Sequence, residues 1–251
     1  MFSSSEKLLS ALCSTQNLII LDLTAFTSED RKFIKNNLPQ IFDGRTTKRN
    51  IPAAAKYMLN LLEKWTEGQV HGAIAEFILI CILRHHGYEQ EYCFRNLEQH
   101  SLKKGFDGLY LDSAKEMWLS ESKSSYKHIE HKRNLTLGYK QIQDNVTGKA
   151  PSDAWGNAYN HSRTVNADDS LQSKLCKLSD DYISGNFTHI EQYNVVLCST
   201  VYTPDISSVE RNKEAVEKWI SSHKSKKELA VIVTTESIGM VIDLLKEIAD
   251  E

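Results

Sequence analysis

The stretch from Ala73 to Leu83 limits the folds open to this chain more than any other segment. Ten of its eleven residues are apolar, and Glu76 is the exception. It lies within residues 69–86, which predict a helix that ends at Gly87. A helix that is apolar on every side must be buried on every side, so other elements have to surround it. A carboxylate in such a helix is costly unless it is paired, hydrogen-bonded or bound to a metal.

The hydrophobic period changes after Gly87 from the helical to the alternating pattern. Strands are expected at residues 17–24, 88–94, 106–111, 116–123, 193–202 and 229–235. Helices are expected from Ser28 (as N-cap) onward and at residues 52–65, 131–146, 171–183, 209–222 and 238–249. Residues 147–169 are polar and predict a loop or insertion. This mixture predicts an α/β fold with a central mixed sheet flanked by helices.

The chain shows no internal repeat and no clear linker. We therefore expect a single domain over residues 1–251. Residues 1–66 would form an N-terminal elaboration. Residues 67–251 would form the core, which closes with a β-α-β-α extension.

Composition narrows the class of protein. The net charge is -3, and the five cysteines are scattered without a C-x-x-C pair, which favours reduced thiols in a cytoplasm. No apolar run approaches the roughly 20 residues of a membrane helix, so no membrane association is expected. The first residues lack the basic and long apolar regions of a signal peptide.

The expected hairpin at 106–123 places two carboxylates side by side. With its turn at residues 112–114, the pairs on one face are Leu111–Met117, Leu109–Leu119 and Asp107–Glu121. Lys123 follows on that face, while Tyr110 and Trp118 point to the other. Like charges on neighbouring strands are unfavourable, so Asp107 and Glu121 indicate a cation between them.

A divalent metal with oxygen ligands, Mg²⁺ or Mn²⁺, fits this pair of acids. Asp107 and Glu121 would hold the metal, and Glu76 would bond a metal-bound water or hold a second metal. Lys123 would orient or help deprotonate the attacking water and stabilise charge on phosphorus. These four residues predict metal-assisted hydrolysis of a phosphodiester.

The same residues carry a family resemblance. The strings GFDG at 105–108 and ESK at 121–123, after the helix with Glu76, resemble the PD-(D/E)XK (restriction-endonuclease-like) nuclease superfamily. Its α-β-β-β-α-β core matches the expected order from residue 67 to about 202. No Pro precedes Asp107. Gln141 or Gln143 matches a glutamine that some members carry on the helix after the third strand.

Three strings, GAIAEFILICIL, KGFDGLYLD and WLSESKSSY, are most similar to the HamA family, the nuclease subunits of Hachiman anti-phage defence systems. This resemblance implies a metal-dependent DNase that works in a heteromeric complex with a helicase (HamB-like) and is released when infection is sensed.

Simpler interpretations apply to single residues. Glu76 can be a structural partner of Arg84 or Lys123, and Lys123 can neutralise Glu121 in a surface ion pair of little energetic value. His128 and His131 are expected to be exposed residues at a helix start, because an H-x-x-H zinc site lacks further ligands here. His85 and His86 are expected to cap their helix.

Two other functions remain open. A sequence-specific restriction endonuclease of the same superfamily would need a base-reading element, for which only residues 147–169 leave room. A DNA-binding or assembly subunit would keep the fold without cutting. Residues 101–150 hold nine Lys or Arg and six Asp or Glu, which suits contacts with a phosphate backbone. The helix at 209–222 and the acidic C-terminal residues are candidate docking elements for a protein partner.

Overall fold

A seven-stranded sheet runs through the computed structural model of the chain, which describes residues 8–10, 16–95, 105–127 and 130–251. The strands are β1 (Leu8–Ser10), β2 (Gln16–Leu23), β3 (Glu89–Gln90), β4 (Gly108–Leu111), β5 (Met117–Ser125), β6 (Asn194–Tyr202) and β7 (Lys227–Thr235). They are ordered β1-β2-β7-β6-β5-β4-β3. The four middle strands are parallel, and the outer strands pair antiparallel. The expected α/β fold with a mixed central sheet is confirmed.

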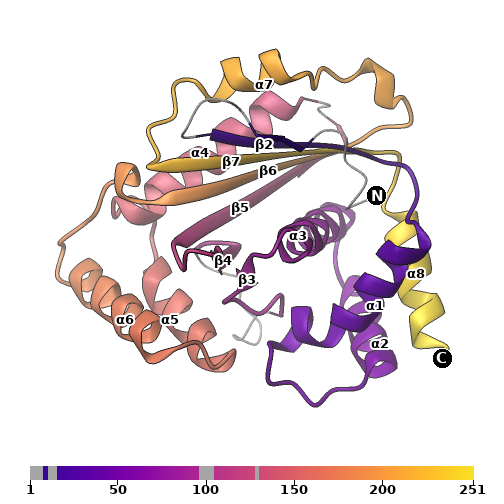
Figure 1. Cartoon of the computed structure of the whole chain (residues 1–251), viewed down its shortest axis with the longest axis horizontal. Coiled ribbons are helices and arrows are strands. Elements are labelled where there is room, and N and C mark those ends of the chain that lie inside the picture. Colours follow the sequence, from indigo (N-terminus) through magenta and orange to yellow (C-terminus); the bar gives the residue numbers. More distant parts are fainter. Residues whose placement is uncertain (1–7, 11–15, 96–104, 128–129) are drawn as a thin grey trace.

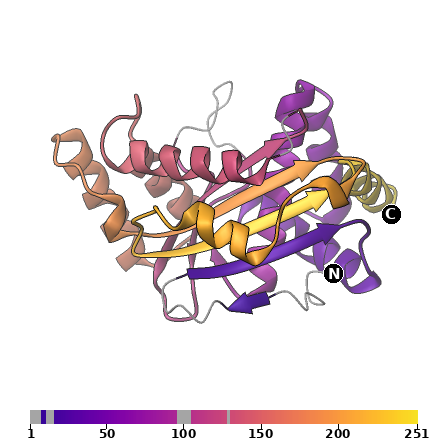
Figure 2. The same ribbon diagram turned by 90° about the horizontal axis from the view of Figure 1, so that it is seen from above.

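Helices cover both faces of this sheet (Figure 1). One face carries α1 (Ser28–Asp43), α2 (Ile51–Leu62), α3 (Glu67–His85) and α8 (Gly239–Ala249). The other carries α4 (His131–Val146), α5 (Ala154–Thr164), α6 (Asp169–Ile183) and α7 (Lys213–Ile220). Short 3-10 turns lie at Ile190–Gln192 and Ile206–Ser208. Figure 2 shows α4 and α7 crossing above the parallel strands. Since both faces are covered, β6 is buried along its whole length, as expected for a strand inside a parallel sheet.

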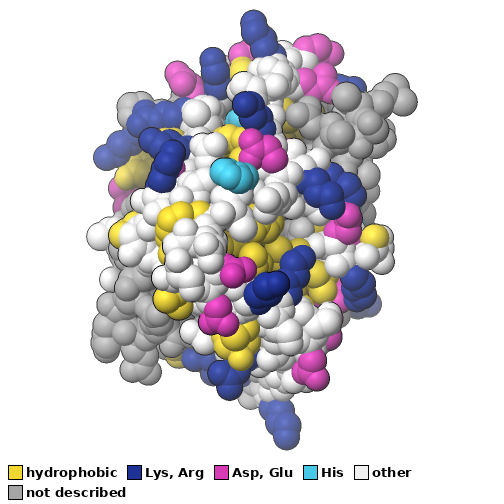
Figure 3. Space-filling view, turned by 90° about the vertical axis from the view of Figure 1, so that its left-hand side faces the viewer, with side chains coloured by type: hydrophobic (Ala, Val, Ile, Leu, Met, Phe, Trp, Pro, Cys, Tyr) yellow, Lys and Arg dark blue, Asp and Glu magenta, His cyan; other side chains and the backbone are white. Residues whose placement is uncertain are grey.

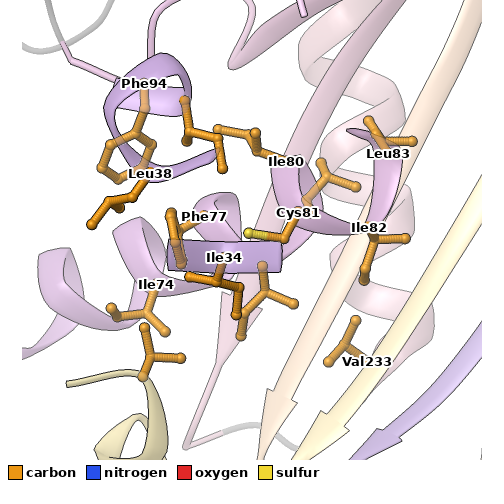
Figure 4. Packing of buried hydrophobic residues seen from close by; sticks show 14 of the residues in the cluster. Ile34, Leu38, Ile74, Phe77, Ile80, Cys81, Ile82, Leu83, Phe94 and Val233 are labelled. Atoms are coloured by element: carbon orange, nitrogen blue, oxygen red, sulfur yellow. The ribbon is translucent and has the colours of Figure 1, made fainter. Parts of the chain in front are cut away.

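Helix α3 is surrounded by apolar side chains, as its sequence predicts. Ile74, Phe77 and Cys81 pack in one cluster with Ile34 of α1 and Val233 of β7 (Figure 4). A capping box between Thr66 and Gln69 begins the helix. Gly87, with φ of +82°, reverses the chain after it, a conformation that favours glycine.

The segment 147–169 is not the loop that its polarity predicts. It contains α5, whose N-cap Asp153 accepts a hydrogen bond from the backbone N–H of Trp155. Trp155, Ala158 and His161 are buried on one side of this helix. The apolar face is small because alanine and histidine form part of it, so periodicity in hydrophobic residues does not reveal it.

Other boundaries differ by a few residues. The N-cap of α1 is Thr27, which forms a capping box with Asp30, and not Ser28. The strand expected at 88–94 is only the two residues of β3. The helix expected at 209–222 is the shorter α7, because Asn212 caps it at Lys213. The bounds of α4 are as predicted.

The face seen in Figure 3 contains the amino ends of the parallel strands together with α5 and α6, and it mixes hydrophobic side chains with charges of both signs. Ile183 and Phe187, beside the end of α6, are among the exposed large apolar residues.

Within the described ranges, no helix is long and apolar enough to cross a membrane. The four described cysteines are free thiols.

Candidate functional site

The hairpin β4–β5 has the predicted register, and it leaves one end of β5 open. Leu111 pairs with Met117 and Leu109 with Leu119, but the ladder ends where Gly108 pairs with Ser120. Beyond that point, residues 121–125 pair with β6 on one side, and no described strand covers the other. We call this open edge of β5, at 121–125, the notch.

Asp107 is fixed at the start of the notch by two backbone contacts. Its N–H donates to the carbonyl of Ser120 over 3.1 Å, and its Oδ2 accepts from the N–H of Ser122 over 2.8 Å. These bonds hold the Asp107 carboxylate at the level of Glu121, as the predicted register requires. Asp107 is half-buried, so the notch opens toward solvent beside it.

Glu121, Lys123 and Gln141 form the centre of the site, which we call the lysine cluster. The Lys123 ammonium donates to Glu121 Oε1 over 2.6 Å and to Gln141 Oε1 over 2.7 Å. Glu121 is fully buried, whereas 27% of the Lys123 side chain is exposed. Of the two glutamines left open by the sequence, Gln141 is therefore the one that contacts Lys123.

Helix α4 packs directly on this cluster at Gly138. A Cβ at Gly138 would lie 3.6 Å from Glu121 Cγ and 3.6 Å from Leu197 Cδ2, in ordinary contact. Glu121 is thus enclosed by α4 and β6. Its Oε2 is buried and has no hydrogen-bond partner among the described residues. A buried carboxylate oxygen without a partner requires an explanation, and room for a cation is one.

Burial raises the pKa of the Glu121 carboxyl well above its usual range, and the charge of Asp107 raises it further. Lys123 opposes this shift. Burial lowers the pKa of Lys123, but the charges of Glu121, Asp107 and Glu76 outweigh burial and raise it. Lys123 is therefore an ammonium ion at neutral pH, and a second cation near Glu121 would favour its ionised form.

Glu76 is half-buried on α3, not fully buried as its apolar surroundings predict. Its charge raises the pKa of both Glu121 and Lys123, so it lies within electrostatic reach of the lysine cluster. The sequence also left open that Glu76 pairs with Arg84. The Arg84 guanidinium, in the last turn of α3, donates to Gln90, Asn37 and Gln40.

Tyr92 is a residue near the site that the sequence analysis did not single out. It is buried, and burial followed by the charges of Asp107, Glu76 and Glu121 raises its pKa. Its ring stacks on His161 with centroids 3.8 Å apart, so it packs in the core beside these acids. Tyr92 follows the two-residue β3 in irregular structure, so no periodic pattern could mark it.

Asp107 and Glu121 suit a divalent metal that keeps several water ligands, and the free Oε2 of Glu121 supports this fit. In the described ranges, no three or more His, Cys, Asp or Glu side chains converge as a ready-made metal group. The structure therefore offers two carboxylates rather than a closed cage with Glu76. Metal binding by Asp107, Glu121 and Glu76 stays a prediction.

His131 is buried, which contradicts the expected exposed position at a helix start. Its Nδ1 lies 2.8 Å from Ser199 Oγ on β6, and its Nε2 lies 3.1 Å from Thr234 Oγ1 on β7. Asn134 donates to the same Ser199 hydroxyl over 3.1 Å. The first turn of α4 docks against the strands, which a sequence pattern alone cannot reveal. His128 lies outside the described residues.

Burial lowers the pKa of His131 to about 4, so the ring is neutral at neutral pH. We call His131, Asn134, Ser199 and Thr234 the histidine cluster.

At the end of α3, His86 is the C-cap residue and its N–H donates to the carbonyl of Ile82.

Part of the basic segment 101–150 is exposed on α4, the helix that carries Gln141, and on the turn before it. The exposed basic residues there are Lys127, Lys132, Arg133 and Lys140. Lys115 instead pairs with Glu89 at the far end of the hairpin. Lys103 and Lys104 lie outside the described residues.

No protein-family model matches the sequence, and a comparison with curated proteins finds no significant match.

Proposed function

We propose that this chain is a metal-dependent DNA nuclease that hydrolyses phosphodiesters at the notch. One observation carries the proposal: a protonated Lys123 held by Glu121 and Gln141, beside Asp107 and a buried carboxylate oxygen without a partner. A buried carboxylate oxygen without a partner can accept a cation, and its position beside a second acid and a lysine supports a hydrolytic site.

Each side chain has a role in this proposal. Asp107 and Glu121 would hold Mg²⁺ or Mn²⁺, which supplies Lewis acidity and a water of lowered pKa when bound. Gln141 fixes the Lys123 ammonium, which orients the attacking water and stabilises charge developing on the phosphate. Glu76 would bond a water in the metal's outer sphere or hold a second metal.

The order of elements supports the superfamily resemblance. Helix α3, strands β3, β4 and β5, helix α4 and, after α5 and α6, strand β6 follow the α-β-β-β-α-β sequence. With the HamA-like strings, this order leads us to propose an effector subunit of an anti-phage complex that acts with a helicase. Restraint by a partner fits a non-specific DNase that would otherwise endanger its own cell.

The test is cleavage of a supercoiled plasmid by the purified chain with Mg²⁺, with Mn²⁺ and with EDTA. The Glu121→Ala, Lys123→Ala double variant is compared with Lys174→Ala, which removes an exposed lysine on α6. We expect metal-dependent nicking that the double variant loses and Lys174→Ala keeps. Equal nicking by the double variant, or nicking in EDTA, would contradict this site.

If the wild-type chain alone does not nick the plasmid, it is assayed with a candidate helicase partner, ATP and damaged or replicating DNA. Cleavage that needs the partner and an intact Lys123 supports a restrained effector. Absence of cleavage there as well overturns the nuclease proposal and favours a non-cutting assembly subunit.

The pattern of fragments separates the non-specific nuclease from a restriction endonuclease. Helix α5 fills most of the segment that a base-reading element would need, and Trp155 and Ala158 commit its inner side to the core. We therefore expect nicks at many positions of the supercoiled plasmid, which give a smear of strands after denaturation. Discrete fragments would favour the restriction endonuclease.

A further inference from the structure

Three aromatic rings meet at the carboxyl ends of β5 and β6, close to the notch. The His71 ring on α3 stacks on Tyr126, with centroids 4.5 Å apart and planes 18° apart. The edge of Tyr202, the last residue of β6, meets His71 at 4.7 Å. We call His71, Tyr126 and Tyr202 the ring platform.

Hydrogen bonds hold the ring platform in place, and part of it reaches the surface. Tyr202 is buried, and its hydroxyl donates to the His71 carbonyl over 2.9 Å. His71 Nδ1 lies 2.8 Å from the Glu67 carbonyl, which fixes the imidazole. His71 and Tyr126 are themselves half-exposed. Two aromatic side chains thus keep a defined orientation at the surface, although neither is part of a hydrophobic core cluster.

A movable cation lies over the ring of Tyr126. The Lys127 ammonium is 5.4 Å from the Tyr126 ring centroid, and Lys127 is exposed. His71 stacks on the same ring, so Tyr126 contacts both an imidazole and an exposed ammonium on a flexible side chain. A planar group can displace this ammonium from the ring and keep its positive charge nearby, which suits a base attached to a phosphate.

The ring platform is near the proposed reaction centre. Tyr126 follows Lys123 by three residues, or about 10 Å of extended chain. Tyr126 stacks on His71 of α3, whereas Lys123 donates to Gln141 of α4, so the two side chains lie toward opposite sides of the sheet. Because no described strand covers residues 121–125, a strand of nucleic acid running along the notch can reach both faces. Helix α3 contributes His71 to the platform and Glu76 to the site, which ties the two together (Figure 1).

We propose that the ring platform stacks an unpaired base of the strand that is cut, so that the substrate is single-stranded DNA, including unwound or frayed duplex. This inference rests on the proposed nuclease function and names its substrate class. Bases inside a duplex stack on one another and must be unstacked before a protein ring can reach them. Aromatic side chains beside lysines are the usual means of holding single strands without reading sequence.

The test measures binding of the full chain in EDTA, where no cleavage occurs. A fluorescein-labelled single-stranded oligodeoxynucleotide of mixed sequence is compared with the blunt duplex by fluorescence anisotropy. The variants are Tyr126→Ala, Tyr126→Phe and Tyr57→Ala. Tyr57 is the matched control because it is an exposed tyrosine on α2 with Arg49 over its ring.

We expect wild type to bind the single strand more tightly than the duplex. Tyr126→Ala should weaken single-strand binding by about tenfold or more, while Tyr126→Phe and Tyr57→Ala stay near wild type. Duplex binding should change little in all variants. Unchanged single-strand affinity in Tyr126→Ala, a wild-type preference for the duplex, or no single-strand binding by wild type would each overturn the ring platform.

These assays distinguish a failure of the nuclease proposal from a failure of the ring platform. Plasmid nicking by wild type together with full single-strand affinity of Tyr126→Ala would refute the ring platform and leave the nuclease standing. A selective loss of binding in Tyr126→Ala, without nicking under any condition, would support the ring platform and refute hydrolysis. Thermal unfolding of Tyr126→Ala checks that the variant folds.

Discussion

Helix α4 covers two polar clusters that differ in how completely their buried polar atoms are hydrogen-bonded. In the histidine cluster, both ring nitrogens of His131 face a hydroxyl, and Asn134 bonds Ser199 and Ser125. In the lysine cluster, Glu121 is buried with one oxygen paired and the other without a described partner. The first cluster is neutral and complete, whereas the second is charged and incomplete.

This difference separates a structural cluster from the proposed reaction centre on the same helix. A complete buried network rigidifies the fold, since every polar group keeps a partner after leaving water. An incomplete one costs stability, because a buried acid without full compensation favours its protonated form. The histidine cluster thus fixes α4, and this rigidity holds Gln141 against Lys123 in the proposed centre.

The largest expected effect comes from Glu121→Gln. This change keeps the shape of the side chain but removes the charge, so we expect a loss of about 10²–10⁴-fold in plasmid nicking. The free energy of unfolding at pH 8 should stay equal or rise, because the variant no longer buries an ionised carboxylate. Nicking and urea denaturation measure the two effects.

Glu116→Gln is the matched control for this variant. Glu116 directly precedes β5 and pairs with Lys226 and Lys227 at the surface. It should retain full activity. Wild-type activity in Glu121→Gln, or a clear loss of stability there, would remove the contrast between the two clusters.

Acid should affect the two clusters with opposite signs. His131 has a folded-state pKa of about 4, below its unfolded value, so its stabilisation is complete above pH 6.5 or so and is lost as pH falls toward 4. The full loss amounts to about 3 kcal/mol. The pKa of Glu121 is raised in the folded state, so its unfavourable effect shrinks as pH falls toward the ordinary carboxyl range.

Urea denaturation between pH 8 and pH 4 tests these signs with wild type, His131→Gln and Glu121→Gln. The His131→Gln variant should lose less stability than wild type on acidification, and Glu121→Gln should lose more. If the free energy of unfolding changed with pH in the same way for all three proteins, neither group would titrate as the structure implies.

A smaller effect is expected from Asn134→Ala. The Asn134 amide is buried and donates to hydroxyls on β5 and β6, so its removal should lower the free energy of unfolding by about 1–2 kcal/mol. Chemical denaturation measures it, with Thr136→Ala on the exposed side of α4 as control. A loss no greater than that of Thr136→Ala would show that the histidine cluster does not anchor the helix.

The smallest effect is expected from Gly138→Ala. The added Cβ meets Glu121 and Leu197 at ordinary contact distance, and alanine favours the helix, so stability should rise by about 1 kcal/mol or less. Thermal unfolding measures this gain, and nicking should be retained. A marked destabilisation would show that α4 is packed more tightly on Glu121 than these distances indicate.

Much of the fold and half of the site follow from local sequence. The apolar run in α3 required burial, and alternation with a short turn set the register of β4 and β5 that brings Asp107 to the level of Glu121. Both are properties of neighbouring residues. The exposed state predicted for His131 was wrong because its partners Ser199 and Thr234 come from distant strands.

The choice between Gln141 and Gln143 could have been made from the sequence. His131, Asn134, Gly138 and Gln141 are spaced by three, four and three residues, so they share one face of a helix. That spacing favours Gln141 over Gln143 once His131 is placed against the sheet. Helix α5 offered no such signal, since its buried side is made largely of alanine and polar residues.

The position of β2 has a consequence for how the molecule is made. Residues 16–23 pair in parallel with 228–235, so two strands more than 200 positions apart become neighbours in the sheet. On the ribosome, β2 is made early, next to its antiparallel neighbour β1, but it cannot pair with β7 until residues 228–235 have been translated. Strands β4 and β5, with α4, can assemble earlier from contacts close in the chain. Synthesis therefore forms the hairpin of the proposed centre well before the sheet around it is complete.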